Sequence, residues 1–248
     1  MDNNGDGLST EGLLVQGWYR DGIKRIERAP KRTKLWASDA GRCHRRAMFH
    51  VLAYEVTHPF AVEAQEYMEL GNAYEANTLD ALWKVLGTRM VAKDGLWLSY
   101  GNWTARADAI VDVGTDHPLV IELKGQGDKW WDYKGKLPQA DHLCQLGMYG
   151  WLYEQLHKRP PELRLVYRAW GHWAEFEVSV EVEKVVAWGL IDGDVRVRTI
   201  PISLAAERVE LERLYRAGQV PDRPNEMLDE CQFQDKPGCL YYGHCWGK

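Results

Sequence analysis

The sequence predicts an α/β fold, in which a mixed sheet is flanked by helices and followed by a C-terminal tail that a metal centre holds in place. Two long segments, 62–86 and 138–158, space their apolar residues at the period of a helix. Between them, and again over 162–181, the chain shows the patterns of strands. Three of the five cysteines lie close together near the C-terminus. Helices interleaved with strands favour a sheet with helices packed on it, and the clustered thiols favour a metal-bound tail.

The length and composition fit a globular protein with one main domain. The chain has 248 residues, of which 45% are hydrophobic and 27% are charged. We expect an N-terminal helical extension over 1–37 and the main domain over 38–248, which includes the tail 221–248. No apolar run of about 18 residues is present, so no membrane span is expected. Residues 1–12 lack the basic and apolar regions of a signal peptide, which predicts a cytoplasmic location, or the host cytoplasm if the chain is viral.

Each element follows from a local pattern. Helices are expected at 9–28, 38–54, 62–86, 138–158 and 203–217. Ala29-Pro30 ends the first of these helices, and Ser38 is a suitable N-cap for the second. Strands are expected at 88–92, 95–99, 103–113, 118–124, 162–170 and 173–181. Residues 184–200 are ambiguous, so their assignment stays open.

Two carboxylates and a lysine lie on two neighbouring predicted strands. Asp108 belongs to 103–113, and Glu122 and Lys124 lie two residues apart in 118–124. If the strands pair as a hairpin, Asp108 meets Glu122, and the spacing of two directs Glu122 and Lys124 to one face. Buried charges of this kind are costly unless a cation or a partner neutralises them. The pattern therefore favours a site for Mg²⁺ or Mn²⁺, and the alternative is an acidic–basic pair on an exposed strand.

The segments around these residues resemble a known nuclease superfamily. ARADAIVDV…LVIELKG is similar to the GxxDxx…ExK core of RecB-type nucleases, QLGMY at 145–149 to their QxxxY motif, and GNAYE at 71–75 to their helical GxxxH/E motif. SDAGRCHRRAMFHVL at 38–52 resembles their SxxxxCxRxxxxxL entry helix. In this order, over 38–248, the motifs resemble the PD-(D/E)XK superfamily, and within it the AddB-like nucleases, the CRISPR-associated Cas-four exonucleases and their viral relatives.

The resemblance implies a restriction-endonuclease-like PD-(D/E)XK core and a Mg²⁺- or Mn²⁺-dependent nuclease. Its substrate would be DNA, with exonuclease action on single-stranded or end-bearing molecules. The implied metal ligands are Asp108, Glu122, Glu75 and the Leu123 carbonyl oxygen. Lys124 would polarise the water or the phosphate, and Gln145 and Tyr149 would position Lys124 and the DNA.

Nucleic-acid contacts are expected from basic and aromatic side chains. The net charge of −5 argues against a protein coated in positive charge but is compatible with a local basic path. Arg45 and Arg46 are candidate phosphate contacts. Trp130 and Trp131 follow Lys124 closely and are candidate stacking platforms for bases, with core packing as the alternative. No GxxxxGK[ST] motif is present, so a helicase, recombination or adaptation partner would be a separate chain.

Four cysteines form a second candidate site. Cys43, Cys231, Cys239 and Cys245 supply four thiolates, which suit zinc and an iron–sulfur cluster equally on spacing alone. The resemblance implies a 4Fe–4S cluster, with Zn²⁺ as the alternative. Cys144 is expected to be a small buried hydrophobe.

The chain departs from the family pattern in the metal ligand and in the cysteine spacing. Glu75 stands where many relatives carry histidine, which makes the site more negative. Seven residues separate Cys231 from Cys239, instead of the usual two, which bears on the type of cluster. The rival functions are a non-catalytic DNA- or protein-binding subunit that keeps the fold, a zinc-stabilised structural protein, and a nuclease for RNA. The intact Asp108, Glu122 and Lys124 favour a DNA nuclease over a subunit without activity.

Overall fold

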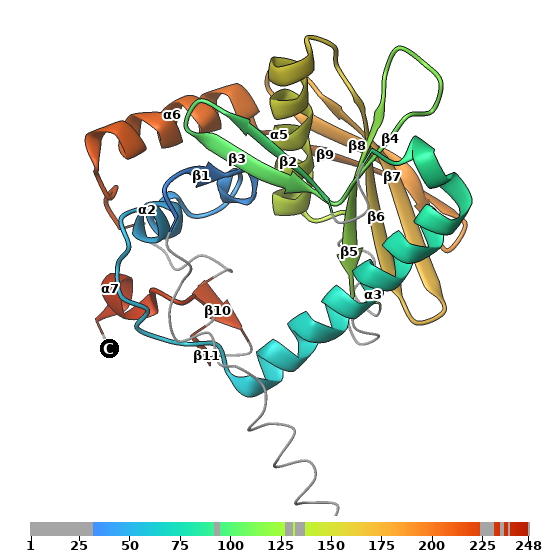
Figure 1. Ribbon diagram of the computed structural model, residues 1–248. Helices are drawn as coiled ribbons and strands as arrows, with labels where there is room; N and C mark the ends of the chain where they lie inside the picture. The colour runs from blue at the N-terminus through green and yellow to red at the C-terminus, as the bar shows by residue number, and fades with distance from the viewer. Residues whose placement is uncertain are drawn as a thin grey trace, which may run out of the picture.

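A mixed sheet flanked by helices forms the centre of the fold, as the sequence predicts (Figure 1). The computed structural model describes residues 32–91, 95–126, 131, 137–223, 231–233, 236–237 and 239–247. The predicted helix at 9–28 lies outside these residues. No helix in the described part of the chain is long and apolar enough to cross a membrane.

The central sheet has six strands in the order β4-β5-β6-β7-β8-β9. Their bounds are Ala109–Val111, Leu119–Gly125, Glu162–Ala169, His172–Val180, Val185–Ile191 and Asp194–Ile200, from β4 to β9. β5 and β6 run parallel, and every other neighbouring pair is antiparallel. A parallel pair requires a crossover connection, and α5 (Ala140–His157) lies in that connection.

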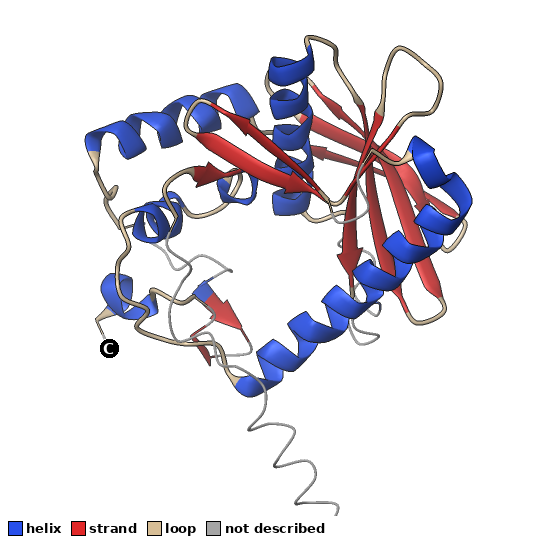
Figure 2. Ribbon diagram, in the orientation of Figure 1, coloured by secondary structure: helices blue, strands red, loops and turns tan. Residues whose placement is uncertain are grey.

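Two helices lie on opposite faces of this sheet (Figure 2). The alternation along β5 separates the faces, because successive side chains of a strand point to opposite sides. Val120 belongs to the main core, which α5 shares, whereas Ile121 and Leu123 belong to a smaller core closed by Leu79 and Leu82 of α3 (Val62–Leu86). The carboxyl end of β5 therefore lies between α5 and α3.

A smaller sheet and α6 complete the main body. The sheet has the order β1-β3-β2, with β1 at Leu35–Trp36, β3 at Trp103–Ala107 and β2 at Leu96–Tyr100. α6 (Leu204–Ala217) begins at Ser203, whose hydroxyl accepts a hydrogen bond from the Ala206 N–H. The indole N–H of Trp103 donates to Glu212 of α6 at 2.8 Å, which ties the helix to the small sheet.

The described part of the tail packs on α2 (His44–Val51). It contains β10 (Gln232–Phe233), β11 (Lys236–Pro237) and α7 (Tyr242–Trp246). Leu240 and Tyr241 are buried against Phe49 of α2, and the Tyr241 hydroxyl lies 3.3 Å from Nδ1 of His50. The tail thus has an apolar attachment of its own, which the sequence did not indicate.

Three elements differ from the prediction, and the segment whose assignment was left open is resolved. The predicted helix 38–54 is the 3₁₀ turn η1 (Ala37–Asp39) followed by the shorter α2, and the predicted strand 88–92 is the 3₁₀ turn η2 (Gly87–Arg89) followed by a single bridge from Met90 to Val111. The predicted strand 103–113 is broken at Asp108, where the chain leaves the small sheet for the central one. The ambiguous segment 184–200 is the hairpin β8–β9.

Candidate active site

The break between β3 and β4 places Asp108 at the junction of the two sheets. Asp108 directly precedes Ala109, which pairs with Ile121, and it lies near enough to Glu122 for the two charges to interact. Its Oδ2 accepts a hydrogen bond from the Leu123 N–H at 2.8 Å. The N–H and C=O of one strand residue point to the same side of the strand, so the Leu123 carbonyl also faces this junction. β4 and β5 thus pair as the predicted hairpin, and Asp108 and Glu122 lie near each other at its end.

Glu122 is the most deeply buried charged group of the site, with 1% of its surface exposed. Its Oε1 accepts a hydrogen bond from Nε2 of Gln145 at 2.7 Å and forms an ion pair with Lys124. The same Gln145 amide donates to the Tyr149 hydroxyl at 2.6 Å. Oε2 of Glu122 is buried and receives no hydrogen bond from the residues that the structure describes. A buried carboxylate oxygen without a partner is costly, so this atom is available to a ligand.

The electrostatics of Asp108 and Lys124 reflect a crowded carboxylate site. Burial raises the pKa of Asp108 well above its ordinary value, and the neighbouring Glu122 raises it further. For Lys124, burial lowers the pKa, but Glu122 and Asp108 outweigh this effect, so the pKa lies above its ordinary value. The ammonium of Lys124 is thus held charged among carboxylates, where a metal cation would also be attracted.

Glu75, on α3, lies near the carboxyl end of β5 because two glycines, one on the helix and one on the strand, allow α3 and β5 to approach closely. A Cβ on Gly125 would lie 2.1 Å from the carbonyl oxygen of Gly71, so only glycine permits this separation. Oε1 of Glu75, one helical turn after Gly71, accepts a hydrogen bond from the Gly125 N–H at 3.1 Å. Burial raises the pKa of Glu75 above its ordinary value.

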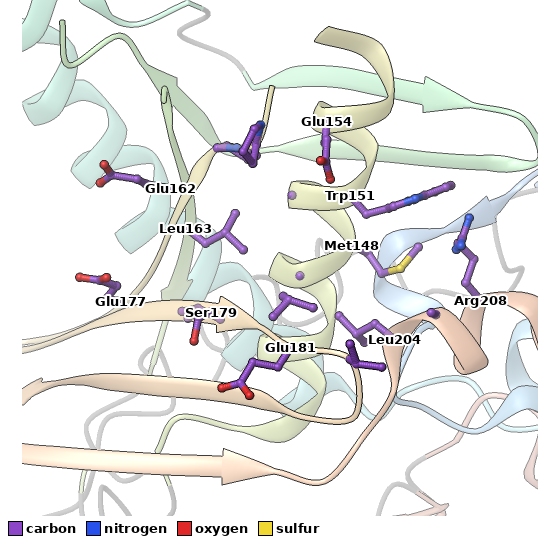
Figure 3. A pocket seen from close by; sticks show the side chains of 18 residues that line it. Met148, Trp151, Glu154, Glu162, Leu163, Glu177, Ser179, Glu181, Leu204 and Arg208 are labelled. Carbon is purple, nitrogen blue, oxygen red and sulfur yellow. The ribbon is translucent and has the colours of Figure 1, made fainter. Parts of the chain in front are cut away.

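A cleft of about 460 Å³ opens beside these carboxylates. Glu75 and Asp108 both line it, with Arg106 and Asn72 at its walls. A second cavity of about 550 Å³ lies at the far end of α5 (Figure 3). Four glutamates border that cavity, but Glu177 pairs with Arg164 and Glu181 with Lys184. The smaller cleft is therefore the one that combines space with converging carboxylates.

The donor set fits a hard divalent cation. Glu75, Asp108, Glu122 and the Leu123 carbonyl offer only oxygen atoms, and Mg²⁺ and Mn²⁺ prefer oxygen. Within the described residues, no three His, Cys, Asp or Glu side chains lie close enough together to enclose a single ion. Mg²⁺ usually keeps several waters and takes one or two carboxylates, so a partial shell is in keeping with its chemistry.

One neighbour of the site escaped the sequence reasoning. His142, on α5, is buried, and its Nδ1 lies 3.0 Å from the Tyr167 hydroxyl. Burial lowers the pKa of His142 to about 3, and the nearby Lys124 charge contributes in the same direction. A neutral imidazole so close to Lys124 adds no further positive charge to the site. Its position on the predicted helix, three residues before Gln145, was the feature of the sequence that could have indicated a place near the site.

The cysteines predicted to act together lie around α2. Cys43 occupies the N-cap position of α2, and Sγ of Cys245 accepts a hydrogen bond from Nε of Arg45 at 3.3 Å. Burial raises the pKa of Cys239 to about 11, and Cys231 and Cys43 are near enough to raise it further. The structure thus brings the entry helix and the late cysteines into one region. Cys144 lies elsewhere, fully buried in the main core, as predicted.

The four residues predicted to contact nucleic acid have different surroundings in the structure. Trp131 is 5% exposed, its indole N–H donates to Asp192 at 2.7 Å, and its ring stacks on His172, so the prediction of a stacking platform is wrong for it. Trp130 lies outside the described residues. Arg45 already donates to the Pro221 carbonyl and to Cys245, so it holds the tail. Arg46 lines a small cavity together with Cys43, and its contact with phosphate stays a prediction.

Comparisons with known proteins found no match. No protein-family model matches it, no curated protein is similar to it, and no solved structure resembles it. The function is therefore inferred from the residues of the site and their geometry.

Proposed function

We propose that this protein is a Mg²⁺- or Mn²⁺-dependent DNA nuclease with a PD-(D/E)XK core. One observation carries the proposal: Glu122 is buried in the sheet beside Asp108 and Lys124, with one oxygen that no described residue contacts by a hydrogen bond. Placing charges there costs stability, and a metal-binding function accounts for the cost. The order of the sequence motifs resembles that of RecB-type nucleases, which supports DNA as the substrate and exonuclease action on single-stranded or end-bearing molecules.

Each residue of the proposed site has a distinct task. Asp108, Glu122 and Glu75 are the proposed ligands of the metal ion, with the Leu123 carbonyl as a further one. The three carboxylates would have to draw closer around the ion, because those of the described residues do not enclose one as they stand. A bound divalent cation supplies a water of lowered pKa and neutralises charge that develops on phosphate. Lys124 donates hydrogen bonds to the attacking water or to a phosphate oxygen, because its ammonium stays charged in this setting.

Gln145 acts through Glu122. Its amide donates to Oε1 of Glu122 and to the Tyr149 hydroxyl, so it fixes the rotamer of the carboxylate. Gln145 is thereby a positioning residue, and Tyr149 fixes Gln145 in turn. Loss of the amide should disturb the orientation of Glu122 without removing its charge.

A 4Fe–4S cluster held by Cys43, Cys231, Cys239 and Cys245 is the second part of the proposal. Its support is the placement of the late cysteines beside the N-terminus of α2. Thiolates that approach one another without a metal would repel, and a cluster removes this repulsion. Zinc is the alternative, and metal analysis of the purified protein separates iron from zinc.

End-labelled single- and double-stranded DNA, incubated with Mg²⁺ or Mn²⁺, tests the proposal directly. Wild-type protein should shorten the label in a metal-dependent manner, and Glu122→Gln should lower the rate by orders of magnitude at unchanged folding. Binding without cleavage by the wild type would identify a non-catalytic subunit. Cleavage of RNA in preference to DNA would correct the substrate and keep the site.

A further inference from the structure

β9 forms an edge of the central sheet, and its side chains are accessible. In the described part of the chain, β8 is the only strand that pairs with β9. Val195 and Val197 are 61% and 64% exposed, although strands usually bury their valines. Exposed, unpaired strand edges form templates for pairing with another chain.

The hairpin turn fixes which backbone groups point outward. Asp192 and Gly193 form the two-residue turn between β8 and β9, with φ values of 49° and 91°. Across such a turn, the flanking residues Ile191 and Asp194 form a hydrogen-bonded pair. The N–H and C=O groups of alternate residues then point away from β8, beginning with Val195 and continuing with Val197. These groups can bond to a neighbouring strand.

In β9, Val195 lies between two residues of opposite charge. Asp194 precedes it and Arg196 follows it. Neither side chain forms an ion pair with another residue in the described portion of the chain, and both are exposed. In an antiparallel pair of two β9 strands centred on Val195, Asp194 of each copy lies directly opposite Arg196 of the other. Directly opposite charges of unlike sign stabilise a strand pair.

Other symmetric registers place like charges together or meet a proline, although some of them would overlap more of β9 than the three residues 194–196 paired here. Centring on Val197 sets Arg196 opposite Arg198, and centring on Arg196 sets it opposite itself. A register shifted further toward the C-terminus meets Pro201, which has no N–H to donate. The charge pattern thus selects the register centred on Val195.

An apolar stripe continues across this edge. Val195 pairs with Leu190 and Val197 with Trp188 on one face of the sheet, and Leu190 and Trp188 are 45% and 54% exposed. In the register centred on Val195, the two Val195 side chains face each other and join the stripes there, whereas each Val197 faces Gly193 in the turn of the other copy. Burial of this apolar surface adds to the hydrogen bonds and ion pairs of the edge.

We infer that β9 is a self-association site, through which two copies of this chain pair antiparallel about Val195. The inference does not depend on the proposed nuclease activity, because Asp108 and Glu122 lie at the opposite end of the sheet order. The two copies would share one continuous sheet. The interface is small, so the dimer forms reversibly and its population depends on protein concentration.

Reciprocal charge reversal tests this register. Sedimentation velocity of the wild type should show a mass that rises from monomer to dimer with concentration. Asp194→Arg alone and Arg196→Asp alone should each weaken the dimer at least about tenfold, because both place like charges opposite each other. An equimolar mixture of the two variants should recover the dimer, since each arginine then faces an aspartate.

Glu183→Arg is the matched control, because it makes the same charge change at an exposed turn at the far end of the hairpins. It should dimerise like the wild type. If either single variant fails to fold, the double variant D194R/R196D replaces it, since it should dimerise by itself. A wild type that stays monomeric at high micromolar concentration overturns the inference. A dimer that both single variants retain also overturns it.

Discussion

The close approach of α3 to β5 can be tested by adding a single methyl group. Gly125→Ala would place a Cβ 2.1 Å from the Gly71 carbonyl oxygen, more than 1 Å short of the ordinary contact distance of 3.4 Å. The obstacle is backbone on both sides, so no side chain can rotate out of the way. α3 must therefore move away from the sheet by about that amount, and Glu75 moves with it.

The displacement should affect both stability and activity. Overpacking of this kind costs about 1–3 kcal/mol, which corresponds to a fall in melting temperature of several degrees for a chain of this size. A shift of about 1 Å at a catalytic group can cost about 100-fold in rate. We therefore expect a clear loss of metal-dependent DNA cleavage in a variant that remains folded at 25 °C.

Two other glycines calibrate the experiment. At Gly71 the added Cβ lies 3.1 Å from the Gly125 carbonyl, so Gly71→Ala should be milder. At Gly150 the nearest atoms, also at 3.1 Å, belong to the flexible side chain of Leu163, and Gly150→Ala should be nearly neutral or stabilising within its helix. Thermal melts and cleavage rates of the three variants form the series. Wild-type stability and activity in Gly125→Ala would refute the reasoning.

Further predictions concern the metal ligands, the thiols and one ion pair. Glu75→Ala should weaken cleavage in Mg²⁺ and recover partly in raised Mn²⁺, and a Mn²⁺ titration without rescue would remove Glu75 from the ligand set. Anaerobically purified protein should be brown and contain iron, and Cys239→Ser should abolish the colour, whereas Cys144→Ser should keep it. Burial raises the pKa of Cys144 to about 12, so iodoacetamide should label this thiol only after unfolding, which mass spectrometry can measure. The hydrogen bond with the His44 ring lowers the pKa of Glu207 below its ordinary value of 4.5. The pair therefore stabilises the fold above pH 4.5, and this stability is lost as the pH falls through the lowered pKa. Urea denaturation of Glu207→Gln should show a flatter pH dependence of the unfolding free energy in this range.

The parts of the fold that sequence alone could predict share a strong local signal. α3 begins and ends where its apolar spacing indicates, at Val62 and Leu86. β5 was predictable from its continuous apolar run, and the two-residue spacing of Glu122 and Lys124 correctly placed both side chains on one face. In these elements the period of the sequence is itself the cause of the structure.

The parts that could not be predicted depend on tertiary contacts. The break at Asp108 has no local signal, because Ala107 and Ala109 are both apolar strand residues that happen to join different sheets. Trp131 could equally be a surface or a core residue until Asp192 and His172 supplied its partners. The contact between Gly71 and Gly125 joins residues that are far apart in the chain, and no periodicity encodes it.

α3 also connects the region of the C-terminal tail with the central sheet. Its N-terminal end follows Phe60, which packs beside the buried tail residues, and its C-terminal part closes the smaller core through Leu82. Glu75 lies between these anchors, about 20 Å along the helix from Val62. If the tail detaches, Phe60 loses its packing partners in the tail, and the N-terminal end of α3, the helix that carries Glu75, is no longer held in place. We therefore expect detachment of the tail to loosen the N-terminal end of the helix that carries Glu75.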